Sequence, residues 1–421
     1  MDPVLRFKIP PRTLSLLKSI GRLADERGES AYAVGGIVRD LFLKRPGVDI
    51  DITVEGDGVT FAEKFAKLTG SEVETFTRFG TSIVVVPGFG KIDIATARTE
   101  SYEKPGALPA VKKSGIVQDL YRRDFSLNAM ALSLSPGYFL KLLDPFGGLE
   151  DLKKGRIRAL HEKSFIDDPT RIFRAIRFEQ RFRERIEPRT QKLLSQAVRG
   201  NYIQRVSGER LRNELRLIFQ EPHPEDAVRR LGELKILPYI HAALGISFRV
   251  KKSLSQIASA IAFFKKTGMV LDEETMVWFQ ALLMEPSPAE AVSLSKRLML
   301  SKAEQKIVTQ SAKVFPTLLK NLGKIGLPVS RFYRFLSPLR PEVQCFLMAM
   351  AGRTVRKKMV HYFERIQETE FWIRGRDLKT LGIEPGFQYS FILLEALNGQ
   401  LDGKFKNRKE ALAWVKKTFV L

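Results

Sequence analysis

The spacing of apolar residues changes at about residue 145, and this change limits the folds that the chain can adopt. Before this point, short β-rich runs alternate with helical stretches, which is typical of a mixed α/β arrangement. Beyond about Leu152, apolar residues recur at helical spacing, and Pro and Gly interrupt the pattern. The sequence therefore predicts an α+β domain followed by an all-α part.

Two of the predicted strands are neighbours in the sequence. The β-rich runs at 82–86 and 91–95 flank residues 87–90, whose glycines can adopt positive φ angles. We therefore expect an antiparallel hairpin here. An earlier strand, at 48–55, alternates apolar and polar residues, so we expect one of its faces to be exposed to solvent.

The chain is strongly basic. It contains 70 Lys and Arg residues against 47 Asp and Glu, which gives a formal net charge of +23. Such an excess favours a polyanionic partner, because the neutralisation of phosphates releases condensed counterions. A generally basic, solvated surface is the alternative explanation.

The sequence carries few signals of an oxidising compartment or of a membrane. A single cysteine, Cys345, excludes an internal disulfide and a cysteine-based zinc site, and the four histidines show no metal-ligand spacing. No stretch of about 20 residues is free of charges, and the N-terminal residues lack the apolar core of a signal peptide. We therefore expect a cytoplasmic protein with no membrane partner.

Three aspartates on predicted strands are candidate metal ligands. Asp49 and Asp51 are two residues apart, so their side chains project from the same face of a strand. Carboxylates in this arrangement suit Mg²⁺, which bridges them to substrate phosphates. Asp93, between Ile92 and Ile94, is the best candidate for the third carboxylate that such a site usually needs. The alternative is that the pair only decorates an exposed strand.

A glycine turn precedes this pair of aspartates. We expect a helix from Pro11 to Arg27 and a strand at 31–34 that ends at Gly35 and Gly36, with Arg39 in the first turns of the next helix. Small residues let an anion approach the backbone, a helix N-terminus supplies partial positive charge, and an arginine supplies a bidentate donor. The order of these features predicts a phosphate-binding turn next to a metal site.

The segment from Gly35 to Asp51 resembles the first motif of the nucleotidyltransferase superfamily typified by polymerase β. Over most of its first 220 residues the chain is similar to class II bacterial tRNA nucleotidyltransferases and to the related bacterial poly(A) polymerases. The resemblance implies that Asp49 and Asp51 bind magnesium, that Gly35 and Gly36 contact the triphosphate, and that Asp93 is the third carboxylate. It also implies an α+β catalytic head with a small mixed or antiparallel sheet, a polymerase β-like palm, followed by an extended all-α neck, body and tail.

Residues 121–130 resemble the second motif of this family, with Ser126 where Thr is usual. The resemblance implies that Arg123, Asp124 and Asn128 face the incoming nucleotide. A carboxylate at this place can accept hydrogen bonds from ribose hydroxyls and so select ribonucleotides. The alternative role of Asp124 is a salt bridge at the entry to a strand.

Residues 167–174 resemble the fourth motif, in which an acidic residue and an arginine three positions later act as a protein template for the base. Asp168 and Arg171 match these positions, and at this spacing we expect them on one side of a helix. A carboxylate accepts from the amino group of C or A and a guanidinium donates to ring acceptors, whereas G and U present the opposite pattern. Arg174 is expected to bind the nucleotide as well. The alternative for Asp168 is an ordinary N-cap, because Pro169 suits the first helical position.

The remaining motifs indicate architecture more than chemistry. Residues 144–148 resemble the third motif, a turn between head and neck, and residues 207–215 resemble the fifth, a helix that supports the nucleotide-binding helix. Arg177 and Arg181 either hold phosphate or cover a solvated face. Two segments within 373–386 resemble a tail found in many members, whose basic residues either grip tRNA or are solvated. The predicted domains are a head at 1–145, a neck at 146–235, a body at 236–340 and a tRNA-binding tail at 341–421.

The predicted activity is the template-independent addition of C, A or both to the 3′ end of tRNA, from CTP or ATP, with Mg²⁺ as the cofactor. A bacterial poly(A) polymerase would share these residues, but the strands between Ile83 and Ala95 lack the Arg- and His-rich hairpin associated with that enzyme. A catalytically silent RNA-binding protein is disfavoured, because three unneutralised carboxylates would repel RNA. The resemblance places the choice between CC, A and CCA in a loop within residues 98–110, whose sequence does not reveal that choice. The sequence does not predict an oligomeric state.

Overall fold

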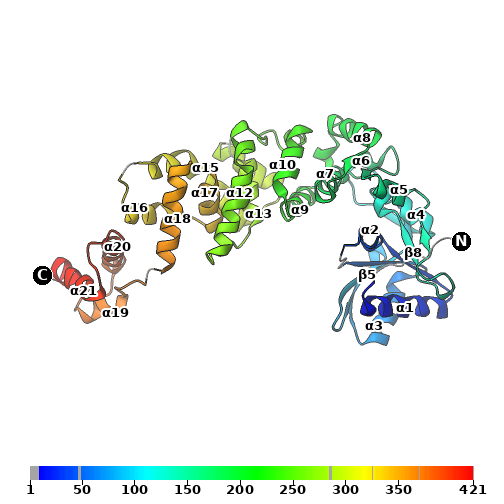
Figure 1. Ribbon diagram of the computed structural model, residues 1–421, viewed down its shortest axis with the longest axis horizontal. Coiled ribbons are helices and arrows are strands. Elements are labelled where there is room, and N and C mark those ends of the chain that lie inside the picture. The colour runs from blue at the N-terminus through cyan, green and yellow to red at the C-terminus, as the bar shows by residue number, and fades with distance from the viewer. Residues whose placement is uncertain (1–8, 46–48, 284–286, 325, 369, 421) are drawn as a thin grey trace. The chain divides into compact units, whose positions relative to one another are not determined.

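The chain divides into two compact units, Met1–Ile240 (unit 1) and His241–Leu421 (unit 2). The computed structural model describes residues 9–45, 49–283, 287–324, 326–368 and 370–420. Unit 1 contains the sheets, and the described residues of unit 2 form helices and their connections (Figure 1). The predicted fold class, an α+β head followed by helices, is confirmed. The finer division into head, neck, body and tail stays a prediction.

A seven-stranded sheet forms the centre of unit 1. Its strands lie in the order β3-β4-β5-β2-β1-β8-β9. β2 and β5 are parallel, and the other neighbours are antiparallel. The strands are β1 (Ser30–Val34), β2 (Ile50–Glu55), β3 (Glu72–Phe76), β4 (Thr81–Val86), β5 (Gly90–Thr96), β8 (Ala131–Ser133) and β9 (Leu142–Leu143).

Two helices, α1 (Pro11–Glu26) and α3 (Gly58–Thr69), cover one face of this sheet (Figure 1). The alternation along β2 and β5 turns apolar residues such as Ile94 toward these helices, and α3 contributes Phe61 and Phe65 to the same core. All three side chains are fully buried. The polar residues that alternate with them therefore lie on the opposite face.

The predicted hairpin is confirmed, and a second one was missed. β4 and β5 pair antiparallel, and Gly88 and Gly90 in their turn have φ angles of +67° and +121°. Part of the predicted loop at 98–110 is instead a hairpin, because β6 (Arg98–Ser101) pairs with β7 (Ala110–Lys113) in a separate sheet. Each of these strands is four residues long and mostly polar, so neither shows a clear alternation of apolar and polar residues.

The expectation of an exposed face along the strand at 48–55 is wrong in part. Val48 lies outside the described residues. On the polar face, Thr53 is buried, because α4 (Ile116–Tyr121) packs against β2. The carboxylate of Glu55 accepts a hydrogen bond from the first N–H of α4 at 2.6 Å. Only the part of this face next to β4 and β5 stays open.

Helices dominate the rest of unit 1, as predicted. The expected absence of strands needs one correction, since β10 (Arg156–Ile157) and β11 (Arg185–Ile186) form a short parallel pair. Pro188 and Pro224 occupy first helical positions, where proline is favoured. The helices are α2 (Gly36–Phe42), α5 (Gly148–Lys153), α6 (Ser164–Asp167), α7 (Arg171–Phe182), α8 (Pro188–Arg199), α9 (Gly208–Phe219), α10 (Pro224–Glu233) and α11 (Leu237–Ile240).

Unit 2 buries large aromatic residues between its helices, among them Trp278, Phe264 and Phe346. Cys345 is buried and free, as expected from a lone cysteine. In the described part of the chain, no helix has the length and apolar composition needed to cross a membrane. The helices are α12 (Phe248–Lys266), α13 (Thr275–Leu282), α14 (Pro288–Arg297), α15 (Lys302–Leu322), α16 (Val329–Leu336), α17 (Pro341–Met350), α18 (Arg353–Glu368), α19 (Gly375–Thr380), α20 (Phe387–Leu401) and α21 (Arg408–Phe419).

The turn at residues 144–148 ties the sheet to the helices that follow it. The Asp144 carboxylate accepts the N–H groups of Gly148 and Leu149 at 2.7 and 2.9 Å. A Cβ atom on Gly148 would lie 2.2 Å from the carbonyl oxygen of Ser126. The turn therefore packs closely against the segment that carries the second motif.

We predict that Gly148→Ala destabilises the protein by about 1–3 kcal/mol, because the backbone near Ser126 must move to make room. Gly137→Ala is the matched control, since a Cβ atom there meets nothing within 4 Å. Urea unfolding followed by circular dichroism measures both variants. Equal unfolding free energies for the two would contradict the predicted clash.

Candidate active site

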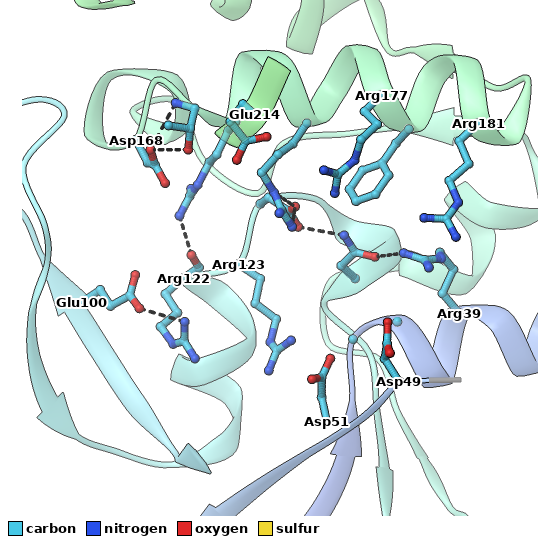
Figure 2. A pocket seen from close by; sticks show the side chains of 18 of the residues that line it. Arg39, Asp49, Asp51, Glu100, Arg122, Arg123, Asp168, Arg177, Arg181 and Glu214 are labelled. Atoms are coloured by element: carbon cyan, nitrogen blue, oxygen red, sulfur yellow. Dashed lines mark hydrogen bonds and ion pairs between the residues drawn. The ribbon is translucent and has the colours of Figure 1, made fainter. Parts of the chain in front are cut away.

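A cavity of about 710 Å³ in unit 1 brings most of the predicted site residues together (Figure 2). Its walls come from the glycine turn and β2 on one side and from α7 and α9 on the other. Asp93 does not line this cavity. It lies in β5, which is the neighbour of β2 in the sheet. The predicted residues that line the cavity are Gly35, Gly36, Arg39, Asp49, Asp51, Arg123, Asp124, Asn128, Asp168, Arg171 and Arg174.

The glycine turn passes close to charged side chains. Gly35 has a φ of +70° and precedes α2, which begins at Gly36. A Cβ atom on Gly35 would lie 2.9 Å from a guanidinium nitrogen of Arg123 and 3.4 Å from a carboxylate oxygen of Asp51. Position 35 therefore requires glycine both for its backbone angle and for space. The predicted contact of this turn with phosphate stays a prediction.

The sheet register sets Asp51 beside Asp93. The two are partners in the parallel pair β2–β5, so they share one face. Burial raises the pKa of Asp51, and the charges of Asp93 and Asp49 raise it further, although Arg123 opposes them. Burial raises the pKa of Asp93 as well, and the charge of Asp49 adds to this. Each carboxylate therefore lacks a sufficient positive counter-charge.

These aspartates fit a divalent cation by their chemistry. Carboxylate oxygens are the ligands that hard cations prefer, and a cation would relieve the repulsion between the three charges. Among the described residues, no group of three or more His, Cys, Asp or Glu side chains is placed so that it could hold a metal ion by itself. A site completed by substrate phosphates and water does not need such a group.

Arg39 connects the turn to the helical part of unit 1. Its guanidinium is buried, donates to Asn128 Oδ1 at 2.7 Å and to Asp40 at 2.9 Å, and lies 4.6 Å from the ring centre of Phe182 on α7. Such a cation–π contact is favourable when it is shielded from water. These contacts fix the position of Arg39, and its predicted contact with phosphate stays a prediction.

Asp124 lies at the centre of a buried polar chain. It accepts hydrogen bonds from Asn128 at 2.9 Å and from Arg174 at 2.8 Å. Burial alone would raise the pKa of Asp124, but the charge of Arg174 and the hydrogen bond from Asn128 lower it to about 2. Asp124 is therefore ionised at neutral pH. The chain Arg39–Asn128–Asp124–Arg174 links α2 to α7, and dashed lines mark it in Figure 2.

Asp168 and Arg171 both line the cavity, but not as neighbours on one helix. Asp168 has extended backbone angles and precedes α7, which begins at Arg171. One Asp168 oxygen accepts the N–H and the hydroxyl of Thr170 at 3.1 and 2.7 Å. Asp168 was alternatively expected to be the N-cap of the helix. Its carboxylate does bind a backbone N–H here, but Thr170 is the residue that directly precedes α7. Arg171 donates to the Ser164 hydroxyl at 2.8 Å and to the Arg122 carbonyl at 2.6 Å.

Arg122 and Arg123 line one side of the cavity and pair with carboxylates that were not among the predicted site residues. Arg122 pairs with Glu100 of β6 at 2.8 Å and with Asp119 of α4 at 2.7 Å, and Arg123 pairs with the same Asp119 at 3.1 Å. Asp119 and the Glu100 side chain are almost fully buried. The adjacency of Arg122 and Arg123 in the sequence was visible, but their acidic partners lie in other elements.

The helix of the fifth motif contributes two more lining residues, Arg210 and Glu214. Arg210 donates to Asp168 at 2.7 Å and to the carbonyl of Gly106 at 3.0 Å, so it joins the fourth motif to the loop between β6 and β7. Glu214 is mostly buried, and burial raises its pKa although Arg174 and Arg177 oppose the rise. The supporting role predicted for this helix thus rests on direct contacts.

Comparison with known proteins gives two family matches. Residues 31–158 match the poly(A) polymerase head domain, and residues 185–244 match a probable RNA and SrmB-binding site of polymerase A. The A-adding tRNA nucleotidyltransferase of Geobacter sulfurreducens is 36% identical over 96% of this chain, which spans only 47% of that relative. The A-adding tRNA nucleotidyltransferase of Halalkalibacterium halodurans is 33% identical over 96% of this chain and 92% of its own length.

Solved structures agree with these matches. The CCA-adding enzyme of Thermotoga maritima complexed with tRNA has a TM-score of 0.84 and 32% identity, and covers 99% of this chain and 97% of its own. A CCA-adding enzyme in an apo form has a TM-score of 0.88 and 34% identity, over 98% of this chain and 97% of its own.

In unit 1 a glycine turn lies beside carboxylates on neighbouring strands, and close relatives of the chain are nucleotidyltransferases, which are enzymes. Because one relative matches over nearly its full length, the chain is a member of the tRNA nucleotidyltransferase and poly(A) polymerase family. Enzymes of this family generally use divalent metal ions.

The buried pair of Asp124 and Arg174 gives a prediction for pH dependence. The pKa of Asp124 lies below its ordinary value of 3.8, so its ionised form stabilises the fold above about pH 4, and this contribution is lost as the pH falls toward 2. We expect Arg174→Met to lower the free energy of unfolding by about 3 kcal/mol at pH 7. The difference from wild type should shrink at pH 3.

Urea unfolding at both pH values measures this difference. The matched control is Arg181→Met on the same helix, since the exposed guanidinium of Arg181 lies 3.8 Å from Glu221. It should change stability by less than about 1 kcal/mol. If Arg174→Met cost the same at pH 7 and pH 3, the low pKa of Asp124 would not depend on Arg174.

Proposed function

We propose that this protein is a template-independent tRNA nucleotidyltransferase, which adds C, A or both to the tRNA 3′ end from CTP or ATP and releases pyrophosphate. One observation carries the proposal: a single cavity is lined by the aspartates Asp49 and Asp51, by the glycine turn and by the base-reading candidates Asp168 and Arg171. Similar proteins are A-adding tRNA nucleotidyltransferases and a CCA-adding enzyme complexed with tRNA, which supports tRNA as the acceptor.

In this proposal, Asp49, Asp51 and Asp93 hold Mg²⁺. When bound, Mg²⁺ neutralises the triphosphate and polarises the attacking hydroxyl. Burial, and after it the repulsion between the aspartates, raises the pKa values of Asp51 and Asp93. A shared cation would lower this repulsion and favour the ionised carboxylates that bind it.

The protein's own groups orient the nucleotide. The backbone at Gly35 and Gly36 is accessible to phosphate, because neither residue carries a side chain, and Arg123 lies beside the turn. Asp124, kept ionised by Arg174, can accept a hydrogen bond from a ribose hydroxyl with its remaining lone pairs. These contacts select a ribonucleoside triphosphate.

Base selection follows from Asp168 and Arg171. Thr170 and Arg210 bind one oxygen of Asp168, which leaves the second oxygen for the amino group of C or A. Arg171 is held by Ser164 and by the Arg122 carbonyl, so its guanidinium is oriented before the nucleotide binds. A carboxylate acceptor and a guanidinium donor together disfavour G and U. No nucleic-acid template is required.

The test is to incubate the purified protein and Mg²⁺ with tRNA transcripts that end at the discriminator base, at C or at CC, each with labelled CTP or ATP. We expect incorporation that stops at or before CCA. Addition of A alone to the CC transcript identifies an A-adding enzyme, and addition of C alone identifies a CC-adding enzyme. Long A tails on unrelated RNA would favour the poly(A) polymerase alternative, and no incorporation on any transcript would contradict the proposal.

The carboxylates are tested in the same assay. Asp51→Asn should lower the rate of addition by roughly a thousandfold, because one ligand of the cation is lost. Glu63→Gln is the matched control, since it removes an exposed carboxylate from α3 on the covered side of the sheet. Full activity of Asp51→Asn would overturn the assignment of the metal ligands.

A further inference from the structure

A partly buried carboxylate, that of Glu184, lies close to Arg39 but does not line the cavity. Helix α7 is capped by Arg183, whose φ of +55° is in the left-handed region. The N–H of Glu184 then donates to the carbonyl of Glu179 at 3.1 Å, so the chain turns back on the helix. One carboxylate oxygen of Glu184, Oε2, is buried and accepts no hydrogen bond from the described residues. A charge in this position depends on its neighbours for compensation.

Two arginines and an aromatic ring lie beside this carboxylate. The guanidinium carbons of Arg39 and Arg45 lie 4.6 and 5.0 Å from the ring centre of Phe182, two residues before Glu184. The charges of both arginines act on Glu184, and Arg39 also lines the cavity. On another side, a Cβ atom on Gly155 would lie 3.8 Å from Cγ of Glu184, so the side chain meets an uncharged turn there. Glu184 is therefore coupled to the cavity through Arg39.

The other charged groups around these arginines have partners of their own. Asp40 pairs with Arg39 at 2.9 Å. The guanidinium of Arg181 lies against the same aromatic ring, at 5.6 Å from its centre, and is 3.8 Å from Glu221. The charge of Arg39 acts on Glu221 as well. Arg39 thus stands among three carboxylates, and Glu184 is the one with a buried oxygen that accepts no hydrogen bond from the described residues.

Burial makes the charge of Glu184 sensitive to pH. It raises the pKa of Glu184 to about 7, although the charges of Arg39 and Arg45 oppose the rise. The ionised and protonated forms therefore coexist near neutral pH. Only the ionised form places a negative charge near Arg39. Because eight arginines and seven carboxylates line the cavity, one additional charge beside it changes its attraction for a triphosphate.

We infer that Glu184 is a positioning residue for the nucleotide, which acts through Arg39 and weakens the attraction of this guanidinium for phosphate when the carboxylate is ionised. The inference rests on the proposed function, because it takes the ligand of the cavity to be a nucleoside triphosphate. A ligand that binds better to the protonated form binds more tightly at low pH and takes up protons as it binds. Glu184 therefore links nucleotide affinity to pH between about 6 and 8.

The test compares wild type with Glu184→Gln, which keeps the size of the side chain and removes its charge. Isothermal titration with CTP and with ATP, in the presence of Mg²⁺ and without RNA, gives the Kd at pH 6 and at pH 8. At pH 8 the variant should bind about fivefold more tightly than wild type, because the wild-type carboxylate is ionised there. At pH 6 the two Kd values should be equal. The ratio at each pH cancels the titration of the nucleotide itself.

Two control variants separate charge from structure. Glu162→Gln removes a carboxylate whose side chain is 72% exposed, also in unit 1, and should bind nucleotide as wild type does at both pH values. Glu184→Asp keeps a carboxylate and should retain the pH dependence. Weaker binding by Glu184→Gln to the same extent at pH 6 and pH 8 would indicate a purely structural role. That result, or equal Kd values for variant and wild type at both pH values, would overturn the inference.

A measurement on wild type keeps the inference testable if Glu184→Gln fails to fold. Titration at pH 7 in two buffers of different ionisation enthalpy gives the number of protons that are exchanged on binding. With excess Mg²⁺ the nucleotide phosphates are already ionised, so we expect net uptake of protons by the protein. No exchange, or net release, would overturn the role of Glu184. Absence of CTP and ATP binding by wild type at every pH would instead contradict the proposed function.

Discussion

The buried chain from Arg39 through Asn128 and Asp124 to Arg174 is the interaction on which the rest of the site depends. It joins α2, which follows the glycine turn, to α7, which begins at Arg171, the candidate for reading the base. Buried charges are costly unless each is paired and hydrogen-bonded, and here each member has a partner. Because the chain fixes the spacing between turn and helix, it also fixes the cavity between them.

The charges that line this cavity are nearly balanced without a ligand. Eight arginines and seven carboxylates line it, and two of those carboxylates belong to the predicted metal ligands. A bound divalent cation would therefore leave the cavity strongly positive, which suits a triphosphate. The chain as a whole also has an excess of basic residues, which favours a polyanionic partner.

The parts of the fold that depend on local pattern were predictable from the sequence. The alternation around Asp51 and Asp93 placed both on strands, and the glycines between 82–86 and 91–95 indicated the hairpin of β4 and β5. The parallel pairing of β2 with β5, which sets Asp93 beside Asp51, joins more distant segments. Prolines were expected to interrupt the helical pattern, and two of them, Pro188 and Pro224, occupy the first positions of α8 and α10. In each case the residues that indicate the strand, turn or helix end lie within it or a few residues from it.

The contacts between distant segments were not predictable. Arg210 donates a hydrogen bond to the carbonyl of Gly106, which is 104 residues away. Every residue has a backbone carbonyl, so the sequence does not reveal which one will accept this bond. Glu100 lies in a polar strand too short to show alternation, so its pairing with Arg122 was hidden as well. The position of Asp168 before α7, and not within it, depends on a turn through Thr170 that the spacing alone does not specify.

The central claim is that protein side chains alone select the base. Isothermal titration of the protein with CTP, ATP, GTP and UTP in the presence of Mg²⁺, without RNA, tests it most directly. We predict that CTP, ATP or both bind at least about tenfold more tightly than GTP and UTP, because Asp168 and Arg171 match only the first two bases. Equal affinity for all four nucleotides would contradict the account.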